Sequence, residues 1–228
     1  MNNYTKLWFL EDFSLMNKMG RWNLMKMCET LEMKRFKKGE EINFNWENKD
    51  IVYFLKTGTV KIVSKSNDYT KYIIKRGHIF GELALLDDEI NNHNTDKAIA
   101  LKDVTVCFIE ADQMRLLMDK HSSLKNNILK LNGFRIKKLE RKLEDLLYKD
   151  SKTRIKEYIF DYISEFGVKK DSNIEVESLL SHTDIANLTN TSRQTVNNVM
   201  SQLRKDNIID YNSEKISIPQ RNKELNQI

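Results

Sequence analysis

The chain has 228 residues, of which 40% are hydrophobic and 31% are charged, and its formal net charge at pH 7 is +5. This length allows one large or two ordinary domains with a proper core, and the composition is that of a soluble globular protein rather than a disordered one. No apolar run approaches the ~18 residues that cross a bilayer, and the first residues lack a signal-peptide pattern, so we expect a cytoplasmic protein without membrane contact.

Residues with catalytic or metal-binding chemistry are scattered. The two cysteines, Cys28 and Cys107, have no partner at metal-ligand spacing, and the four histidines are equally separate. The sequence contains no nucleophile elbow, phosphate-binding loop or dinucleotide fingerprint. We therefore expect no metal site and no enzymatic activity, with both cysteines buried as small apolar residues.

The first half of the chain changes from a helical to a strand pattern near residue 33. Upstream, apolar residues between Leu15 and Cys28 recur at roughly helical spacing. Downstream, β-branched and aromatic runs at 51–55, 59–63, 69–74 and 104–109 are separated by glycines. This pattern predicts a small antiparallel sandwich or jelly roll over about residues 33–110, with Thr57-Gly58 as a hairpin turn.

A segment that interrupts the strands contains Gly81-Glu82-Leu83-Ala84. It predicts a short helix whose free N–H groups point inward, beside a glycine that a ligand can approach closely. A tight turn without a binding role is the alternative interpretation.

Residues 111–149 return to a helical pattern that carries an a/d seam. The seam residues are Leu129, Asn132, Ile136, Leu139, Leu143 and Leu146. Such a seam packs either against its own domain or against the same helix of a second chain, and we favour the homodimer. The excess of positive over negative charge is also concentrated here, with eight Lys or Arg against three Asp or Glu in residues 122–149.

Asp150-Ser151 then marks a hinge between domains. A helix is predicted over residues 153–166, and Gly167 closes it. Its residues Ile155, Ile159, Tyr162 and Ile163 face a second core.

Residues 181–204 predict two short helices joined by a tight turn. Ser181 and Asp184 form a capping-box start, Asn190 suits the left-handed corner, and Ser192 can cap the second helix. The second helix has a buried stripe at helical spacing, which consists of Val196, Val199, Met200 and Leu203. Beyond it, residues 208–211 and 215–218 flank a short turn and predict a β-hairpin, the wing of a winged helix.

The second helix of this pair has an unusual exposed face. Arg193, Gln194, Asn197 and Asn198 project together near its N-terminal end, where an ordinary solvated face favours Lys and Glu. Arg can bind guanine O6 and N7, and Gln or Asn can pair with adenine, when a helix-turn-helix enters the major groove. We expect DNA recognition, and the alternative is a helical hairpin with a polar surface.

The order of β roll, long helix and winged helix-turn-helix resembles the catabolite-activator and fumarate-nitrate regulator (CRP/FNR) superfamily. The most specific match is Thr191-Ser192-Arg193-Gln194-Thr195-Val196, which is similar to the family's Ser-Arg-Glu-Thr-Val motif. The resemblance implies an α+β fold: a cyclic-nucleotide-binding-like jelly roll (1–121), a dimerisation helix (122–149) and a winged helix-turn-helix (150–228). It also implies a homodimer that binds near-palindromic double-stranded DNA and contacts RNA polymerase.

The resemblance assigns roles to several residues of the helix-turn-helix. It implies that Arg193 reads guanine, while Gln194 replaces the usual Glu and Asn198 stands where the catabolite activator has a second Arg. Both departures favour a site richer in A·T. The expected phosphate contacts are Ser181, His182, Thr183 and Ser192.

In the effector pocket the resemblance is partial. Gly81-Glu82-Leu83 matches the family's phosphate cassette, but Thr95-Asp96 stands where cyclic-AMP binders have Arg-Ser, and Leu139-Glu140 replaces the adenine-facing Thr-Ser. A carboxylate ~4 Å from a phosphate costs about 4 kcal/mol at an effective dielectric of 20, although Lys97 can compensate in a shifted register. We therefore do not expect ordinary cyclic-AMP binding.

Other effectors of the family differ in what they require. An iron–sulfur cluster needs a cysteine cluster that this sequence lacks, whereas haem stays open through His78 and Cys107. We expect a regulator that is either active without a ligand or controlled by another small molecule.

Overall fold

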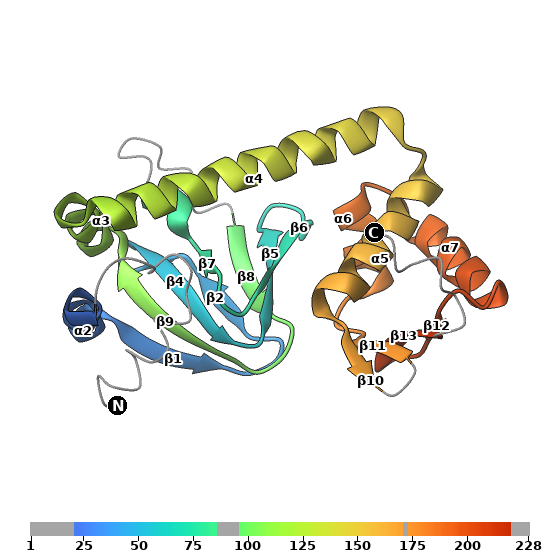
Figure 1. Ribbon diagram of the computed structural model, residues 1–228, viewed down its shortest axis with the longest axis horizontal. Helices are drawn as coiled ribbons and strands as arrows, with labels where there is room; N and C mark the ends of the chain where they lie inside the picture. Colours follow the sequence, from blue (N-terminus) through green and yellow to red (C-terminus); the bar gives the residue numbers. More distant parts are fainter. Residues whose placement is uncertain (1–20, 86–95, 171–172, 220–228) are drawn as a thin grey trace. The chain divides into compact units, whose positions relative to one another are not determined.

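The computed structural model describes residues 21–85, 96–170 and 173–219 (Figure 1). The chain divides into two units, Met1–Leu139 and Glu140–Ile228, and one long helix runs across the division. Of the predicted N-terminal helix, the structure confirms α2 (Arg21–Thr30), and the positions before residue 21 lie outside the described residues. No helix in the described ranges is long and apolar enough to cross a bilayer.

Antiparallel strands in two sheets make up most of the first unit. They are β1 (Glu32–Phe36), β2 (Glu41–Asn43), β3 (Asn45–Trp46), β4 (Lys49–Thr57), β5 (Thr59–Ser64), β6 (Thr70–Lys75), β7 (Ile79–Phe80), β8 (Asp96–Ala100) and β9 (Val104–Glu110). One sheet has the order β1-β9-β4-β3, with β7 also paired to β4, and the other has the order β2-β8-β5-β6. The predicted β roll is therefore confirmed.

The strand β4 shows how the alternating pattern builds two cores. Its residues Ile51, Tyr53 and Leu55 are buried between the two sheets, while Val52 and Phe54 are buried on the opposite face. That second face is covered by α2, α3 (Ala111–Lys120) and the first turns of α4 (Ser122–Tyr148). Each fully buried apolar side chain of this size contributes about 1.5–3 kcal/mol.

Both cysteines lie in this helix-covered core, which confirms their predicted burial. Cys28 comes from α2 and Cys107 from β9, and neither side chain is exposed to solvent. The imidazole of His78, by contrast, lies at an exposed position between β6 and β7. The fold thus places the two residues considered for haem in different environments.

The predicted hairpin at Thr57-Gly58 is wrong. The strands on either side, β4 and β5, belong to different sheets and do not pair with each other. Gly58 has φ +90°, and a Cβ at this position would lie 2.5 Å from Val104 Cγ1 and 2.6 Å from the Asp103 carbonyl oxygen. The glycine is required because the chain crosses between sheets in a left-handed conformation with no room for a side chain.

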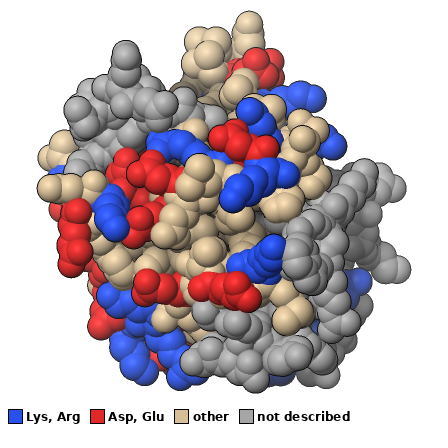
Figure 2. All heavy atoms as spheres, turned by 90° about the vertical axis from the view of Figure 1, so that its left-hand side faces the viewer, with Lys and Arg blue, Asp and Glu red and all other residues tan. Residues whose placement is uncertain are grey.

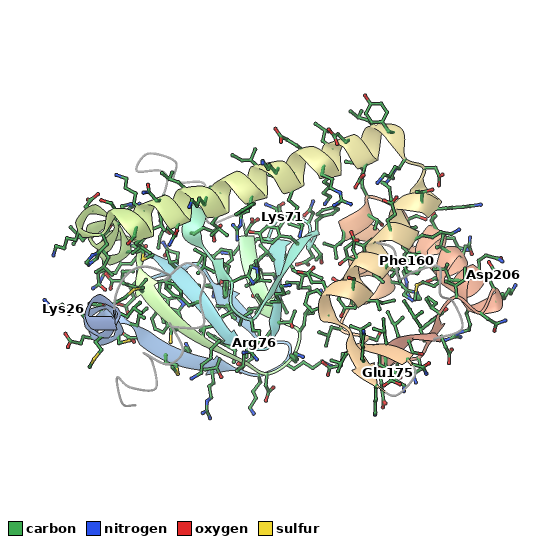
Figure 3. The ribbon with its side chains drawn as sticks, viewed as in Figure 1. Lys26, Lys71, Arg76, Phe160, Glu175 and Asp206 are labelled. Carbon is green, nitrogen blue, oxygen red and sulfur yellow. The ribbon has the colours of Figure 1, made fainter. Side chains whose placement is uncertain are left out.

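The second unit is a winged helix. Its elements are α5 (Ser151–Phe166), β10 (Val168–Lys170), β11 (Asn173–Glu177), α6 (His182–Thr189), α7 (Arg193–Lys205), β12 (Asp210–Tyr211) and β13 (Lys215–Pro219). The strands form one antiparallel sheet in the order β10-β11-β13-β12, so the predicted terminal hairpin is confirmed. Glu175 of this sheet, labelled in Figure 3, pairs with Lys215 at 2.6 Å.

The helix α5 begins and ends through different means. Asp150 caps its start by accepting from the backbone N–H of Lys152 and Thr153. Its predicted last residue is right, but Gly167 has an extended φ of −73° rather than a left-handed one. Glycine is needed here because a Cβ would lie 2.3 Å from the Ile163 carbonyl oxygen.

Charged side chains of both signs cover the face seen in Figure 2. Lys and Arg are interspersed there with Asp and Glu. This arrangement agrees with a net charge that is only mildly basic. A strong single-sign field is therefore not a feature of that face.

Candidate nucleic-acid interface and effector site

The first helix of the helix-turn-helix, α6, begins with the predicted capping box. The Ser181 hydroxyl accepts from the Asp184 N–H at 3.1 Å, and the Asp184 carboxylate accepts from the Ser181 N–H at 3.0 Å and from its hydroxyl at 2.6 Å. Asp184 is 6% exposed. These bonds satisfy donors that a helix start otherwise leaves free, and they fix where α6 begins.

The turn after α6 confirms the role expected of Asn190. This residue is left-handed, with φ 51° and ψ 56°, and the Thr191 N–H bonds back to the Ala186 carbonyl at 2.9 Å. Arg154 of α5 holds the turn from outside, since its guanidinium donates to the carbonyls of Thr189 at 3.1 Å and Asn190 at 3.2 Å. Sequence reasoning missed Arg154.

The second helix, α7, is capped and buried as predicted. The Ser192 hydroxyl accepts from the Thr195 N–H at 3.0 Å, a cap worth about 1 kcal/mol. The inner face is fully packed, and no side chain in its stripe is more than 4% exposed: Val196, Val199, Met200 and Leu203. The helix is therefore fixed in rotation, which decides which side chains face outward.

Three of the four candidate base-reading residues are exposed. Arg193, Gln194 and Asn198 present their side chains to solvent at the N-terminal end of α7. Asn197 is half-buried instead, and its amide oxygen contacts Nδ1 of His182 on α6. The free reading surface thus comprises one guanidinium and two amides.

The candidate phosphate-contact residues surround the same helix ends. Ser181, Thr183 and Ser192 are exposed, and His182 is half-buried against Asn197. The hydroxyls of Ser181 and Ser192 are already engaged in the two caps. These residues lie at the N-terminal ends of α6 and α7, which is where contacts with DNA phosphates are favourable.

The wing is tied to the C-terminal end of α7. The Arg204 guanidinium lies 3.6 Å from the centre of the Tyr211 ring, and its Nε is 3.4 Å from the Asp210 carboxylate. Arg204 therefore holds the strand β12 against the helix.

In the first unit, Glu82 occupies the position that the family resemblance gives to a ribose-binding carboxylate. It begins the 3₁₀ helix η2 (Glu82–Leu85), which confirms the predicted short helix. The side chain is 0% exposed and forms an ion pair with Arg135 of α4. Beyond that ion pair, the carboxylate oxygens have no hydrogen-bond partner among the described residues.

Arg135 is a second residue that sequence reasoning missed. Its guanidinium also donates to the Ile79 carbonyl at 3.2 Å and lies 5.5 Å from the Tyr72 ring, and burial lowers its pKa. A signal for it existed, because Leu124, Ile128 and Arg135 follow one face of α4 at spacings of four and seven. A charged residue in register with buried positions needs a partner inside.

The other effector-pocket candidates have interactions of their own, are exposed on α4, lie beside or within η2, or lie outside the described residues. Asp96 starts β8, and its carboxylate pairs with Lys71, which is labelled in Figure 3, at 2.7 Å. Lys97 pairs with Glu41 at 2.7 Å. Leu139 and Glu140 are exposed on α4, Gly81 precedes η2 with φ +79°, Leu83 lies within η2, and Thr95 lies outside the described residues.

The predicted seam on α4 is mostly uncovered. Four of its apolar side chains are 55–66% exposed: Leu129, Ile136, Leu139 and Leu143. This much apolar surface on one helix is unusual, because its contact with water is unfavourable. Leu146 is half-buried. Asn132 is half-buried too, and its amide nitrogen is buried without a hydrogen-bond partner among the described residues.

These features define a class: a regulator with a cyclic-nucleotide-binding-type β roll, a long helix and a winged helix-turn-helix. Two family models match in the same order, the cyclic nucleotide-binding domain over residues 33–121 and the Crp-like helix-turn-helix domain over residues 153–223. The chain belongs to the CRP/FNR superfamily of transcription regulators.

Individual relatives are distant but nearly full-length. The chain is 24% identical to the global nitrogen regulator of Synechococcus elongatus over 191 residues, which cover 82% of this chain and 86% of that protein. It is 22% identical to the CRP-like cAMP-activated global transcriptional regulator of Mycobacterium tuberculosis, with coverage of 77% and 78%. The fold is similar to that of the c-di-GMP-responsive regulator CLP of Xanthomonas campestris, with a TM-score of 0.69, 16% identity and coverage of 88% and 99%.

Proposed function

We propose that this chain regulates transcription by reading duplex DNA in a sequence-specific way through the N-terminal end of α7. The observation that carries the proposal is the exposure of Arg193, Gln194 and Asn198 at the N-terminal end of a helix whose inner face is packed and whose Asn197 contacts α6. A guanidinium matches the two acceptors of guanine, and each amide matches adenine.

The proposal includes a homodimer formed through α4. A second copy of the chain is the occupant that suits an apolar seam on a helix long enough to pair with its twin. Pairing sets two α7 helices against successive grooves, so a near-palindromic site is expected. Contact with RNA polymerase and a cytoplasmic location belong to the same proposal.

The test starts with selection of bound duplexes by the purified, ligand-free protein. Arg193→Ala should then weaken binding to the selected site by about 1–3 kcal/mol and relax the preference at one base pair per half-site. Lys205, an exposed cation in the last turn of α7, is our candidate for a further phosphate contact. Lys205→Ala is the matched control, since loss of a phosphate contact weakens selected and random duplexes alike. Equal loss on both duplexes for Arg193→Ala would contradict the reading role.

A second candidate is a sensor whose ligand switches DNA binding. It is favoured by the buried carboxylate of Glu82 beside Arg135, because such a pair can bind a sugar hydroxyl and a phosphate. The Lys71-bound carboxylate of Asp96 does not fit a cyclic phosphate. We therefore propose a regulator that acts without cyclic AMP.

Calorimetric titration with cyclic AMP and cyclic GMP separates the two candidates. We expect no heat of binding at micromolar concentrations. Micromolar affinity that is lost in Glu82→Gln would establish the sensor instead. The M. tuberculosis relative named above provides a positive control, since its name describes a cAMP-activated protein.

A further inference from the structure

A cavity of about 460 Å³, partly open to solvent, lies in the winged-helix unit. It is formed by α5, the start of α6, the inner face of α7 and the wing, and its lining residues include Tyr158, Tyr162, His182, Met200 and Tyr211. Ligand sites in proteins commonly fall in the range of about 300–1,000 Å³. Two of the expected phosphate contacts, Ser181 and His182, line the cavity, whereas the base-reading residues Arg193, Gln194 and Asn198 do not.

We propose that the cavity is a binding site for an uncharged aromatic ligand with a hydrogen-bond acceptor, and that the ligand alters the setting of α7. This goes beyond the proposed function, because it places a second input in the DNA-binding unit itself. Three features support this proposal: the uncharged lining of the cavity, the hydroxyl of Tyr158, and the contacts of two lining residues, His182 and Tyr211, with α7.

The residues that line the cavity favour an uncharged ligand. Aromatic and aliphatic side chains alternate with hydroxyls and one amide, and the described lining residues include no Lys, Arg, Asp or Glu. The α6 N-terminus at the cavity is an anion site on general grounds, but the Asp184 carboxylate already accepts the Ser181 N–H and hydroxyl. A second anion there would be repelled, so a neutral ligand fits best.

Tyr158 supplies the polar contact that a neutral ligand needs. Its neighbour Tyr162 donates to the Glu177 carbonyl at 2.8 Å, whereas the Tyr158 hydroxyl forms no hydrogen bond within the described part of the chain. Burial raises the pKa of Tyr158, so the phenol stays a donor. Tyr158 is half-buried and lines the cavity, so its phenol can donate to a ligand acceptor there.

Two contacts connect the cavity to the reading helix. His182 lines the cavity and contacts the Asn197 amide of α7, and Tyr211 lines it while its ring stacks on Arg204 of α7. Met200 contributes the inner face of α7 directly. A ligand that displaces the His182 ring therefore shifts Asn197, which lies beside the base-reading residues, and one that displaces the Tyr211 ring shifts Arg204 at the other end of α7.

The test is a titration of the full chain with coumarin, a neutral planar compound with one carbonyl acceptor. Binding is monitored by nuclear magnetic resonance in the absence of DNA. We expect saturable binding, with shifts of the amide signals of His182, Tyr211 and α7. Coumarin-3-carboxylate is the charged counterpart and should bind at least tenfold more weakly. Because no DNA is present, the result does not depend on whether the proposed function is right.

Two variants locate the site. Tyr158→Phe removes only the hydroxyl and should weaken coumarin binding about tenfold, while Ser178→Phe fills part of the cavity and should abolish it. Thermal melting checks that both variants fold. The proposal would be overturned if coumarin showed no saturable binding, or if both variants bound coumarin as tightly as the wild type. It would also be overturned if coumarin-3-carboxylate bound as tightly as coumarin, or if binding left the amide signals of α7 unchanged.

Discussion

The ion pair between Glu82 and Arg135 makes the strongest quantitative prediction about stability. Glu82 is 0% exposed, and the Arg135 side chain is 25% exposed. Removing one partner of a buried pair costs about 3–5 kcal/mol, because it leaves an uncompensated charge in the interior. Since Arg135 keeps some contact with solvent, we expect Arg135→Met to cost about 3 kcal/mol, the lower end of that range.

The assay can isolate the unit that contains the pair. All three tryptophans of the chain, Trp8, Trp22 and Trp46, precede residue 47, so tryptophan fluorescence reports on the first unit alone. With a slope of about 2 kcal/mol per molar urea, a loss of 3 kcal/mol lowers the midpoint by about 1.5 M. Replacing both residues, as in Glu82→Gln with Arg135→Met, should restore most of that loss.

A surface pair provides the control. Lys49 and Glu110 lie 2.8 Å apart with side chains 56% and 34% exposed, so Lys49→Met should leave the midpoint nearly unchanged. An Arg135→Met midpoint within experimental error of the wild type would refute the reasoning. A double variant no more stable than Arg135→Met would refute it as well.

Three further predictions concern the caps, the seam and alkaline pH. Asp184→Ala removes the capping box and should cost about 1–3 kcal/mol, seen as faster hydrogen exchange in α6; unchanged exchange would contradict it. Leu143→Asp should convert a dimer to monomers in sedimentation analysis, whereas Phe134→Asp, another exposed apolar position on α4, should not. Burial raises the pKa of Tyr162 to about 12 from 10.0, so the folded state favours the neutral phenol. Its contribution is complete below pH 10 and falls as the pH rises toward 12, and Tyr162→Phe should flatten that decline in near-ultraviolet circular dichroism melts.

The sequence was most informative where structure depends on neighbours along the chain. The capping box at Ser181, the left-handed Asn190 and the cap at Ser192 all involve bonds within three or four residues. The buried stripe of α7 follows from helical periodicity in the same local way. These features could be predicted because few alternatives satisfy the same backbone groups.

Prediction from the sequence failed for residues whose contacts lie far away along the chain. Whether Gly58 ends a hairpin or a crossover depends on β4 pairing with β9, and no local pattern at Thr57-Gly58 distinguishes the two. Arg154 and Arg135 bind groups 35 to 56 residues away, so the sequence around each arginine does not identify its partner. Gly167 shows the same limit, since its requirement comes partly from the packing of Ile174.

The contacts of α7 with α6 and with the wing reduce the number of its polar side chains that are free to contact DNA, and a count of charges does not reveal this. Of the polar residues on α7, Asn197 is held by His182 and Arg204 by Tyr211 and Asp210, so both help to orient the helix. Under the proposed function, the residues left exposed at the N-terminal end of α7, Arg193, Gln194 and Asn198, would carry sequence discrimination with few redundant contacts. Each good bidentate base contact is worth about 1–3 kcal/mol, so loss of any one of the three should change specificity measurably rather than be compensated by its neighbours.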